Sequence, residues 1–137
     1  MASKLEVESL DHIVLRVRDL ERTLGFYGGV LGLPIECLEE YRAGTRPFVS
    51  ARVGPTALID LVPDSTYDPE KASAVGGLMH FCLHLRNPDL GALVPWLREQ
   101  GVEVIEDEPM IRMGARGLGP AIYLRDPDGY IVEIQQG

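Results

Sequence analysis

The chain repeats one order of landmarks at an offset of about 70 residues, and this repeat limits the folds open to it. A histidine in a strand-like run, an aspartate before a helical run, a glycine after it and an acidic residue in a later strand-like run each occur twice. These pairs are His12 and His80, Asp19 and Asp89, Gly32 and Gly101, and Asp60 and Glu133. We therefore expect two copies of one structural unit.

Hydrophobic periodicity predicts the order βαβββ for each copy. In the first copy, strands are predicted at 10–17, 35–41, 48–53 and 57–62, and a helix at 20–31. In the second, strands are predicted at 79–85, 102–105, 121–125 and 130–135, and a helix at 90–100. We expect one domain, 1–137, made of a first module (10–63), a polar, turn-rich linker (64–77) and a second module (78–137).

A βαβββ unit has a helix on one side of its sheet only, so its other face stays uncovered unless a second unit joins it. Two such units side by side would form an α+β fold with a curled eight-stranded sheet and a concave face. If a pseudo-twofold axis relates the units, the first and last strands of both lie beside that axis. Polar groups on those four strands can then point at one another.

The four acidic and imidazole landmarks lie on these strands. His12 and His80 belong to the first strands, and Asp60 and Glu133 to the last strands. Two imidazoles with one or two carboxylates suit a divalent metal and leave positions open for a substrate. The side chain of Asp60 is shorter than that of Glu133, so three roles stay open for it: a direct ligand, a ligand through water, or a group that orients a histidine.

Composition excludes several classes of protein. The 137 residues carry a net charge of −8, which argues against nucleic acid or an anionic membrane as a partner. No apolar run approaches the length of a membrane span, and the N-terminus lacks the pattern of a signal peptide. The two cysteines, Cys37 and Cys82, have no disulfide-like spacing. We expect free thiols in a cytoplasmic protein.

Two further segments carry signals. The Asp-Pro-Asp-Gly sequence at 126–129 lies between two β-rich runs and predicts a hairpin turn. The segment 112–119 holds three glycines and two arginines, Arg112 and Arg116. It is either a mobile lid that meets an anionic substrate or a long hairpin turn. Cys82 lies between His80 and His84, and we interpret it as a small core or pocket residue rather than a nucleophile.

Several motifs resemble the vicinal oxygen chelate superfamily. They are the Leu-Asp-His-Ile-Val-Leu-Arg-Val-Arg-Asp-Leu run at 10–20, the helix end at 26–33, the Met-His-Phe strand at 79–81 and the Asp-Pro-Asp-Gly-Tyr-Ile-Val-Glu run at 126–133. That superfamily includes glyoxalase I, type I extradiol dioxygenases, fosfomycin resistance proteins and bleomycin-binding proteins. The resemblance covers nearly the whole chain.

Within the superfamily, the chain looks most like bacterial glyoxalase I. This resemblance implies that the metal ligands are His12, Asp60, His80 and Glu133, and that Arg16 anchors a glutathione carboxylate. The implied metal is one divalent ion per site, from among Ni, Zn, Mn, Co and Fe. Glyoxalase I has Glu or Gln where Asp60 stands, and Asp64 replaces an Asn that contacts glutathione. The segment 112–119 resembles a glyoxalase-domain-containing subgroup instead.

These observations predict a glyoxalase-like lyase or isomerase that acts on a small substrate with vicinal oxygens through a metal-stabilised enediolate. Glu133, or Asp60 in its place, is the expected general base. Two alternatives stay open. One is an extradiol ring-cleaving dioxygenase in which His12, His80 and Glu133 hold Fe(II). The other is a metal-free binding protein of the bleomycin-resistance type. The resemblance also implies a homodimer.

Overall fold

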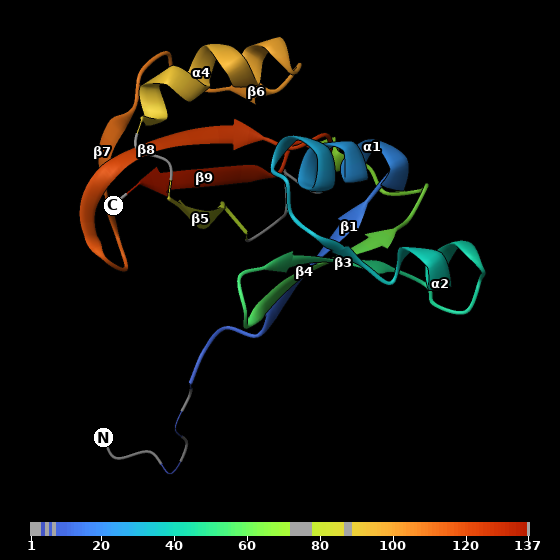
Figure 1. The fold of residues 1–137 in the computed structure, drawn as a ribbon. Helices are drawn as coiled ribbons and strands as arrows, with labels where there is room; N and C mark the ends of the chain where they lie inside the picture. The colour runs from blue at the N-terminus through green and yellow to red at the C-terminus, as the bar shows by residue number, and fades with distance from the viewer. Residues whose placement is uncertain (1–3, 5, 7, 72–77, 87–88, 137) are drawn as a thin grey trace. The chain divides into compact units, whose positions relative to one another are not determined.

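The computed structural model describes residues 4, 6, 8–71, 78–86 and 89–136 (Figure 1). They divide into two units, residues 1–67 and 68–137. The predicted linker at 64–77 lies partly outside the described residues, because 72–77 are not described.

The first unit is a four-stranded sheet with helical segments. Its elements are β1 (His12–Val17), α1 (Leu20–Leu24), the π-helical turn η1 (Gly25–Val30), β2 (Ile35–Glu36), α2 (Leu38–Arg42), β3 (Val49–Val53) and β4 (Ala57–Pro63). The strand order is β1-β4-β3-β2, with β1 parallel to β4 and the other pairs antiparallel. The first and last strands of the unit are therefore direct neighbours.

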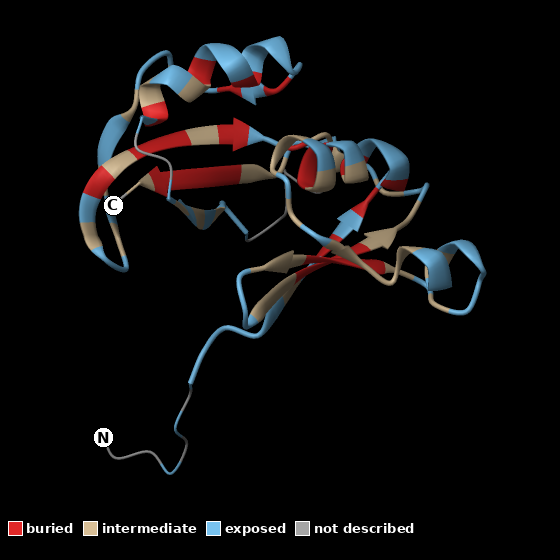
Figure 2. Ribbon diagram, in the orientation of Figure 1, coloured by how far each residue is buried: buried red, intermediate tan, exposed pale blue. Residues whose placement is uncertain are grey.

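One face of this sheet forms the apolar core of the unit. Successive side chains of a strand point to opposite faces, and in β1 the buried Leu15 and Val17 alternate with the exposed Val14 and Arg16 (Figure 2). Leu61 of β4, opposite Leu15, is also fully buried. Further buried side chains come from the helical segment: Leu20, Phe26 and Tyr27.

The second unit is a five-stranded sheet with one longer helix. Its elements are β5 (Phe81–Leu85), α4 (Leu90–Glu99), β6 (Glu103–Val104), β7 (Met110–Gly114), β8 (Gly117–Arg125) and β9 (Ile131–Gln136). The strand order is β5-β9-β8-β6, and β7 pairs with β8. Strand β5 runs parallel to β9, which repeats the pairing of β1 with β4. The predicted α+β class, with two β-rich modules, is confirmed.

The predicted helix starts are also confirmed. The Asp19 carboxylate accepts a hydrogen bond from the backbone N–H of Arg22, and that of Asp89 accepts one from Ala92. Each carboxylate satisfies a donor that the first helical turn would otherwise leave unpaired. In the second unit, α4 contributes the buried Leu90, Val94 and Leu97 to a core that also contains four strand residues: Ile122, Leu124, Val132 and Ile134.

The predicted strand at 35–41 is wrong beyond its first two residues. Strand β2 ends at Glu36, and α2 begins at Leu38. Cys37 between them has φ 65°, a left-handed conformation that breaks an extended chain. Glu39 and Glu40 in the first turn favour a helix because they face the positive end of its dipole.

The second unit also has a strand that was not predicted. Met110–Gly114 forms β7, and β8 begins at Gly117 rather than at residue 121. Residues 115 and 116 form the turn between them. The segment 112–119 thus belongs to a β-hairpin whose turn is residues 115 and 116, shorter than the long turn of one interpretation, and its role as a lid stays a prediction. The strands number four in one sheet and five in the other.

The turn at 126–129 confirms its prediction. The Asp126 carboxylate accepts hydrogen bonds from the backbone N–H groups of Asp128 and Tyr130, at 2.8 and 2.9 Å. Gly129 has φ 89°, a value that favours glycine. This turn fixes the register of β8 and β9, and so the position of Glu133 on the sheet.

Candidate active site

Glu133 lies at the centre of the sheet of the second unit. In register, it is opposite Cys82 of β5 on one side and Tyr123 of β8 on the other. Residues in register point to the same face of a sheet, so these three side chains form a row across three strands. The face they share is opposite the one that carries the buried Val132 and Ile134.

The carboxylate of Glu133 is buried and only half satisfied. The residue is 5% exposed, and its Oε1 lies 3.2 Å from Nε2 of His80. Its Oε2 is buried and has no hydrogen-bond partner among the described residues. An unpaired buried carboxylate oxygen costs free energy, because it has given up its water without gaining another donor. It is therefore an open acceptor for a cation or a proton.

Burial and the charge of Glu133 raise the pKa values of two neighbouring side chains. Burial raises the pKa of the Tyr123 hydroxyl, and the Glu133 carboxylate raises this pKa further, while Arg112 opposes the shift. Partial burial first, and then the Glu133 carboxylate, raise the pKa of the Cys82 thiol to about 11. The thiol is therefore protonated at neutral pH, which agrees with its interpretation as a pocket residue rather than a nucleophile.

A cavity of about 420 Å³ opens over Cys82 and Glu133 of this row within the second unit. Its lining comes from β5 and the residue before it, from β9 and from the β7–β8 hairpin. The lining residues are His80, Cys82, His84, Met113, Gly114, Ala115, Arg116, Glu133 and Gln135. A volume of this size is typical of small-molecule sites. The predicted residues His80 and Glu133 thus lie together in one cavity.

In the first unit, Asp60 lies on β4 and accepts a hydrogen bond from Ser50. The distance from Ser50 Oγ to Asp60 Oδ1 is 2.5 Å, and Arg46 donates in turn to Ser50 Oγ at 3.2 Å. Asp60 is 9% exposed. Its neighbour in β1 is Val14. The burial of this carboxylate is thus supported by a short chain of donors.

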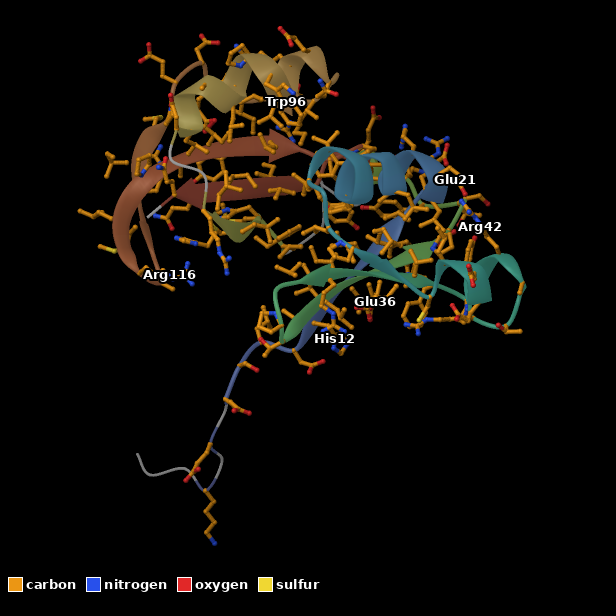
Figure 3. The ribbon with its side chains drawn as sticks, in the orientation of Figure 1. His12, Glu21, Glu36, Arg42, Trp96 and Arg116 are labelled. Atoms are coloured by element: carbon orange, nitrogen blue, oxygen red, sulfur yellow. The ribbon has the colours of Figure 1, made fainter. Side chains whose placement is uncertain are left out.

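His12 is at the start of β1 (Figure 3) and shares the sheet face of Asp60. Its ring Nδ1 lies 2.7 Å from Oδ2 of Asp11. This hydrogen bond raises the pKa of the exposed imidazole, and the negative charges of Asp60 and Asp11 add to the effect. The other ring nitrogen, Nε2, is the one this contact leaves for a ligand.

Arg16 lies on the same face of β1, two positions beyond Val14. Its Nε lies 3.4 Å from Oδ2 of Asp64, and its side chain is 63% exposed. Asp64 also accepts hydrogen bonds from the Thr66 hydroxyl and backbone N–H, which with Arg16 lower the pKa of this carboxyl. The role of Arg16 as a substrate anchor stays a prediction.

The predicted ligands occur as one pair in each unit. Within the described part of the chain, no three His, Cys, Asp or Glu side chains are grouped so as to hold a metal ion. The donor types nevertheless fit a divalent cation, because His80 offers a nitrogen and Glu133 an unpaired carboxylate oxygen. The joint participation of all four residues stays a prediction.

Sequence patterns did not single out Ser50 and Gln135. Ser50 supports Asp60, and the amide of Gln135 donates to the backbone oxygens of Arg112 and Gly117. Polar residues in strands ordinarily face solvent, so neither stands out. The signal available for Gln135 was its position two residues beyond Glu133, which places it on the same face of β9.

A protein-family model matches nearly the whole chain. Residues 9–134 match the model described as Glyoxalase/Bleomycin resistance protein/Dioxygenase superfamily. The chain belongs to this superfamily. This glyoxalase/bleomycin resistance/dioxygenase superfamily is the one its motifs resemble. Within the described residues, no helix is both long and apolar enough to cross a membrane.

Similar members of the superfamily carry different names. Virulence protein STM3117 of Salmonella typhimurium is 29% identical over 95% of this chain and 85% of its own length. The mitochondrial methylmalonyl-CoA epimerase of Bos taurus is 30% identical over 93% and 73% of the two chains. A probable lactoylglutathione lyase of Synechocystis is 27% identical over 91% and 92%.

Solved structures agree with the affiliation. The crystal structure of STM3117 is similar with a TM-score of 0.73 and 27% identity, covering 96% of this chain and 98% of the other. A glyoxalase/dioxygenase from Nostoc punctiforme has a TM-score of 0.74 at 21% identity, with 99% and 95% covered. The first likeness extends to the sequence, and the second shows a shared fold.

Proposed function

We propose that this chain is a divalent-metal-dependent enzyme that moves a proton at a carbon next to two neighbouring substrate oxygens, as a glyoxalase-like lyase or isomerase. One observation carries the proposal. Glu133 keeps a buried carboxylate oxygen without a hydrogen-bond partner among the described residues, in a cavity of small-molecule size. A protein that only packs its core has no use for such a group.

Glu133 is the proposed general base. His80 holds Oε1, so the carboxylate has a fixed orientation while Oε2 stays available to accept a proton. A base must reach the proton that it abstracts, and the cavity brings a substrate to this side chain. The neutral Tyr123 hydroxyl and Cys82 thiol beside it add no competing negative charge.

His80 and Glu133 are also proposed as metal ligands, and the sequence repeat assigns His12 and Asp60 to the same role. When bound, a divalent ion would draw electron density from the substrate oxygens and make the adjacent C–H more acidic. Members of the superfamily commonly use such an ion. Because Ser50 already occupies Oδ1 of Asp60, we propose that Asp60 has only its second oxygen for this purpose.

Metal loading of stripped protein tests the proposal. Chelator-treated wild type, Glu133→Gln and His80→Ala would each be reloaded with Ni, Zn, Mn, Co or Fe, and bound metal measured by elemental analysis. We expect one ion per wild-type chain and loss of stoichiometric binding in both variants, because each variant removes a proposed direct ligand. His84→Ala is the matched control, because it removes an imidazole from the same cavity without removing a proposed ligand.

Activity assays then separate the reaction classes. The loaded wild type should isomerise the hemithioacetal of methylglyoxal and glutathione or a related small substrate, and Glu133→Gln should lose this activity. Ring cleavage of a catechol by the Fe(II) form would instead favour the dioxygenase alternative. A wild type that binds none of the five metals would contradict both enzymes and favour a metal-free binding protein.

A further inference from the structure

Arg116 lines the cavity but has no role in the proposed chemistry. It lies at the tip of the β7–β8 hairpin (Figure 3) and lines the cavity together with the residues around Glu133. The titratable groups that line this cavity are His80, Cys82, His84, Arg116 and Glu133. Arg116 is thus the one permanent positive charge among the lining residues, and Glu133 the one carboxylate.

Hydrogen bonds from Gln135, a lining residue of the cavity on β9, hold the β7–β8 hairpin in place. The Gln135 amide donates to the backbone oxygens of Arg112 at 2.9 Å and Gly117 at 3.5 Å. Gly114 and Gly119 permit this close approach, since a Cβ at either would overlap the Gln135 side chain or the Gln136 carbonyl oxygen. The tip that carries Arg116 is therefore fixed relative to β9, the strand of Glu133.

Of the two charged groups that line the cavity, the Glu133 carboxylate has a partner and the Arg116 guanidinium has none among the described residues. The Glu133 carboxylate already has His80 at 3.2 Å. The Arg116 guanidinium has no hydrogen bond or ion pair with any described residue, whereas three other arginines of the unit are engaged. Arg98 contacts Asp107, Arg112 donates to the Ile111 carbonyl, and Arg125 contacts Glu103. An unpaired guanidinium at a cavity wall is suited to a planar anion, which it can bind through two parallel N–H groups.

We propose that Arg116 is a specificity-determining residue that binds an anionic group, a carboxylate or a phosphate, at the end of the substrate remote from the reacting carbon. The inference rests on the proposed function in assigning the reacting end to Glu133. An anchor of this kind matters in a chain of net charge −8, because the overall field repels anions. The substrate class is then a small anionic molecule with neighbouring oxygens.

Alkylation of Cys82 tests this inference without a known substrate. Cys82 is a free, exposed cysteine that lines the same cavity. Its thiolate can be alkylated by iodoacetate, which is anionic, or by iodoacetamide, which is neutral and similar in size. Peptide mass spectrometry would give the rate for each reagent in metal-free protein. Because both reagents consume the thiolate, the ratio of the two rates cancels the thiolate fraction and reports the preference of the cavity for an anion.

The expected result is a lower iodoacetate-to-iodoacetamide ratio at Cys82 in Arg116→Gln than in wild type. A decrease of about two- to fivefold corresponds to the loss of one exposed ionic contact, and high salt should shrink the difference. An unchanged ratio would overturn the inference. The test needs neither metal nor turnover, so a failure of the proposed function would leave its outcome unaffected.

Two controls separate Arg116 from the general charge of the protein. Arg125→Gln makes the same substitution in the same unit, at a side chain that pairs with Glu103 and does not line the cavity, and it should leave the ratio unchanged. Cys37 belongs to the first unit and gives a reference ratio within every sample. An equal decrease in Arg125→Gln would overturn the assignment to Arg116.

Competing anions identify the source of the charge. Acetate and inorganic phosphate, each compared with chloride at matched ionic strength, should differ in how far they slow iodoacetate at Cys82. The anion that slows alkylation by iodoacetate in wild type but not in Arg116→Gln indicates which group of the substrate Arg116 binds. Protection by neither anion would overturn the inference, because an anion-binding residue must be occupied at high anion concentration.

Discussion

At the scale of single residues, the contact between His80 and Glu133 joins two parts of the chain that are far apart in sequence. His80 and Glu133 are 53 positions apart in the chain, and the parallel pairing of β5 with β9 brings them to 3.2 Å. The repeat placed them on the first and last strands of the second module, and the structure shows that these strands pair. The repeat could not predict that Ser50 supports Asp60 or that Gln135 holds the hairpin, since a neutral polar residue in a strand has no distinctive pattern.

The Cys82 thiol provides a prediction at this scale. Its pKa of about 11, against an ordinary 9.0, leaves about 100-fold less thiolate at pH 8 than an unperturbed thiol would have. Glu133→Gln removes a negative charge that opposes ionisation, so the pKa should fall towards 9.0 and alkylation by iodoacetamide at pH 8 should accelerate about tenfold. A pH profile of the alkylation rate measures both quantities.

The conservative variant Glu133→Asp serves as the control, because it keeps the charge and should keep a high thiol pKa. A Glu133→Gln profile with its midpoint still near that of wild type would show that burial alone sets the pKa of Cys82.

At the scale of elements, local signals predicted starts and turns better than strand lengths. Asp19 and Asp89 predicted two helix starts, and the turn at 126–129 predicted the hairpin of β8 and β9. The prediction of a strand at 35–41 was wrong because no sequence pattern indicates that Cys37 adopts a left-handed conformation. Strand β7 was missed because the glycines of 114–119 suggest a loop, whereas two of them make room for neighbouring groups.

The close approach at Gly119 leads to a stability prediction. In Gly119→Ala the new methyl group would overlap the carbonyl oxygen of Gln136, a backbone atom that cannot move without distorting β9. We expect the free energy of unfolding to fall by about 1–3 kcal/mol, as in other overpacked sites. Urea denaturation monitored by circular dichroism would measure it.

Gly25→Ala is the matched control for this substitution. Gly25 lies in the helical segment with φ −59°, and a Cβ there meets no atom within 4 Å. Alanine should leave stability unchanged or raise it by up to about 1 kcal/mol. Equal losses in both variants would contradict the steric explanation for Gly119.

At the scale of the whole molecule, the repeat predicted two similar units, and each has its first strand parallel to its last. The α+β class follows from such a repeat. The grouping of both units into one domain, 1–137, and the cytoplasmic location stay predictions. They depend on contacts between units and on the cell, which strand patterns within a unit do not report.

The expected homodimer is a prediction at this scale. Light scattering coupled to size-exclusion chromatography should give twice the chain mass of 15.1 kDa. The reason is the superfamily resemblance, together with exposed apolar side chains such as Met79, Met113 and Leu118, which favour burial against another surface. A mass of one chain at all concentrations would contradict it.

The hydrogen bonds from Gln135 to the β7–β8 hairpin affect how such a protein can change over evolutionary time. The amide donates only to backbone oxygens. Among the described non-glycine residues only Cys37 has a positive φ, so Ala115 and Arg116 have negative φ values that any residue type can adopt. The turn therefore does not require particular side chains at these two positions. Mutation can exchange them while the strand that carries Glu133 stays as it is. A lineage can thus change the side chains at the tip and inherit the strand and carboxylate of Glu133 unaltered.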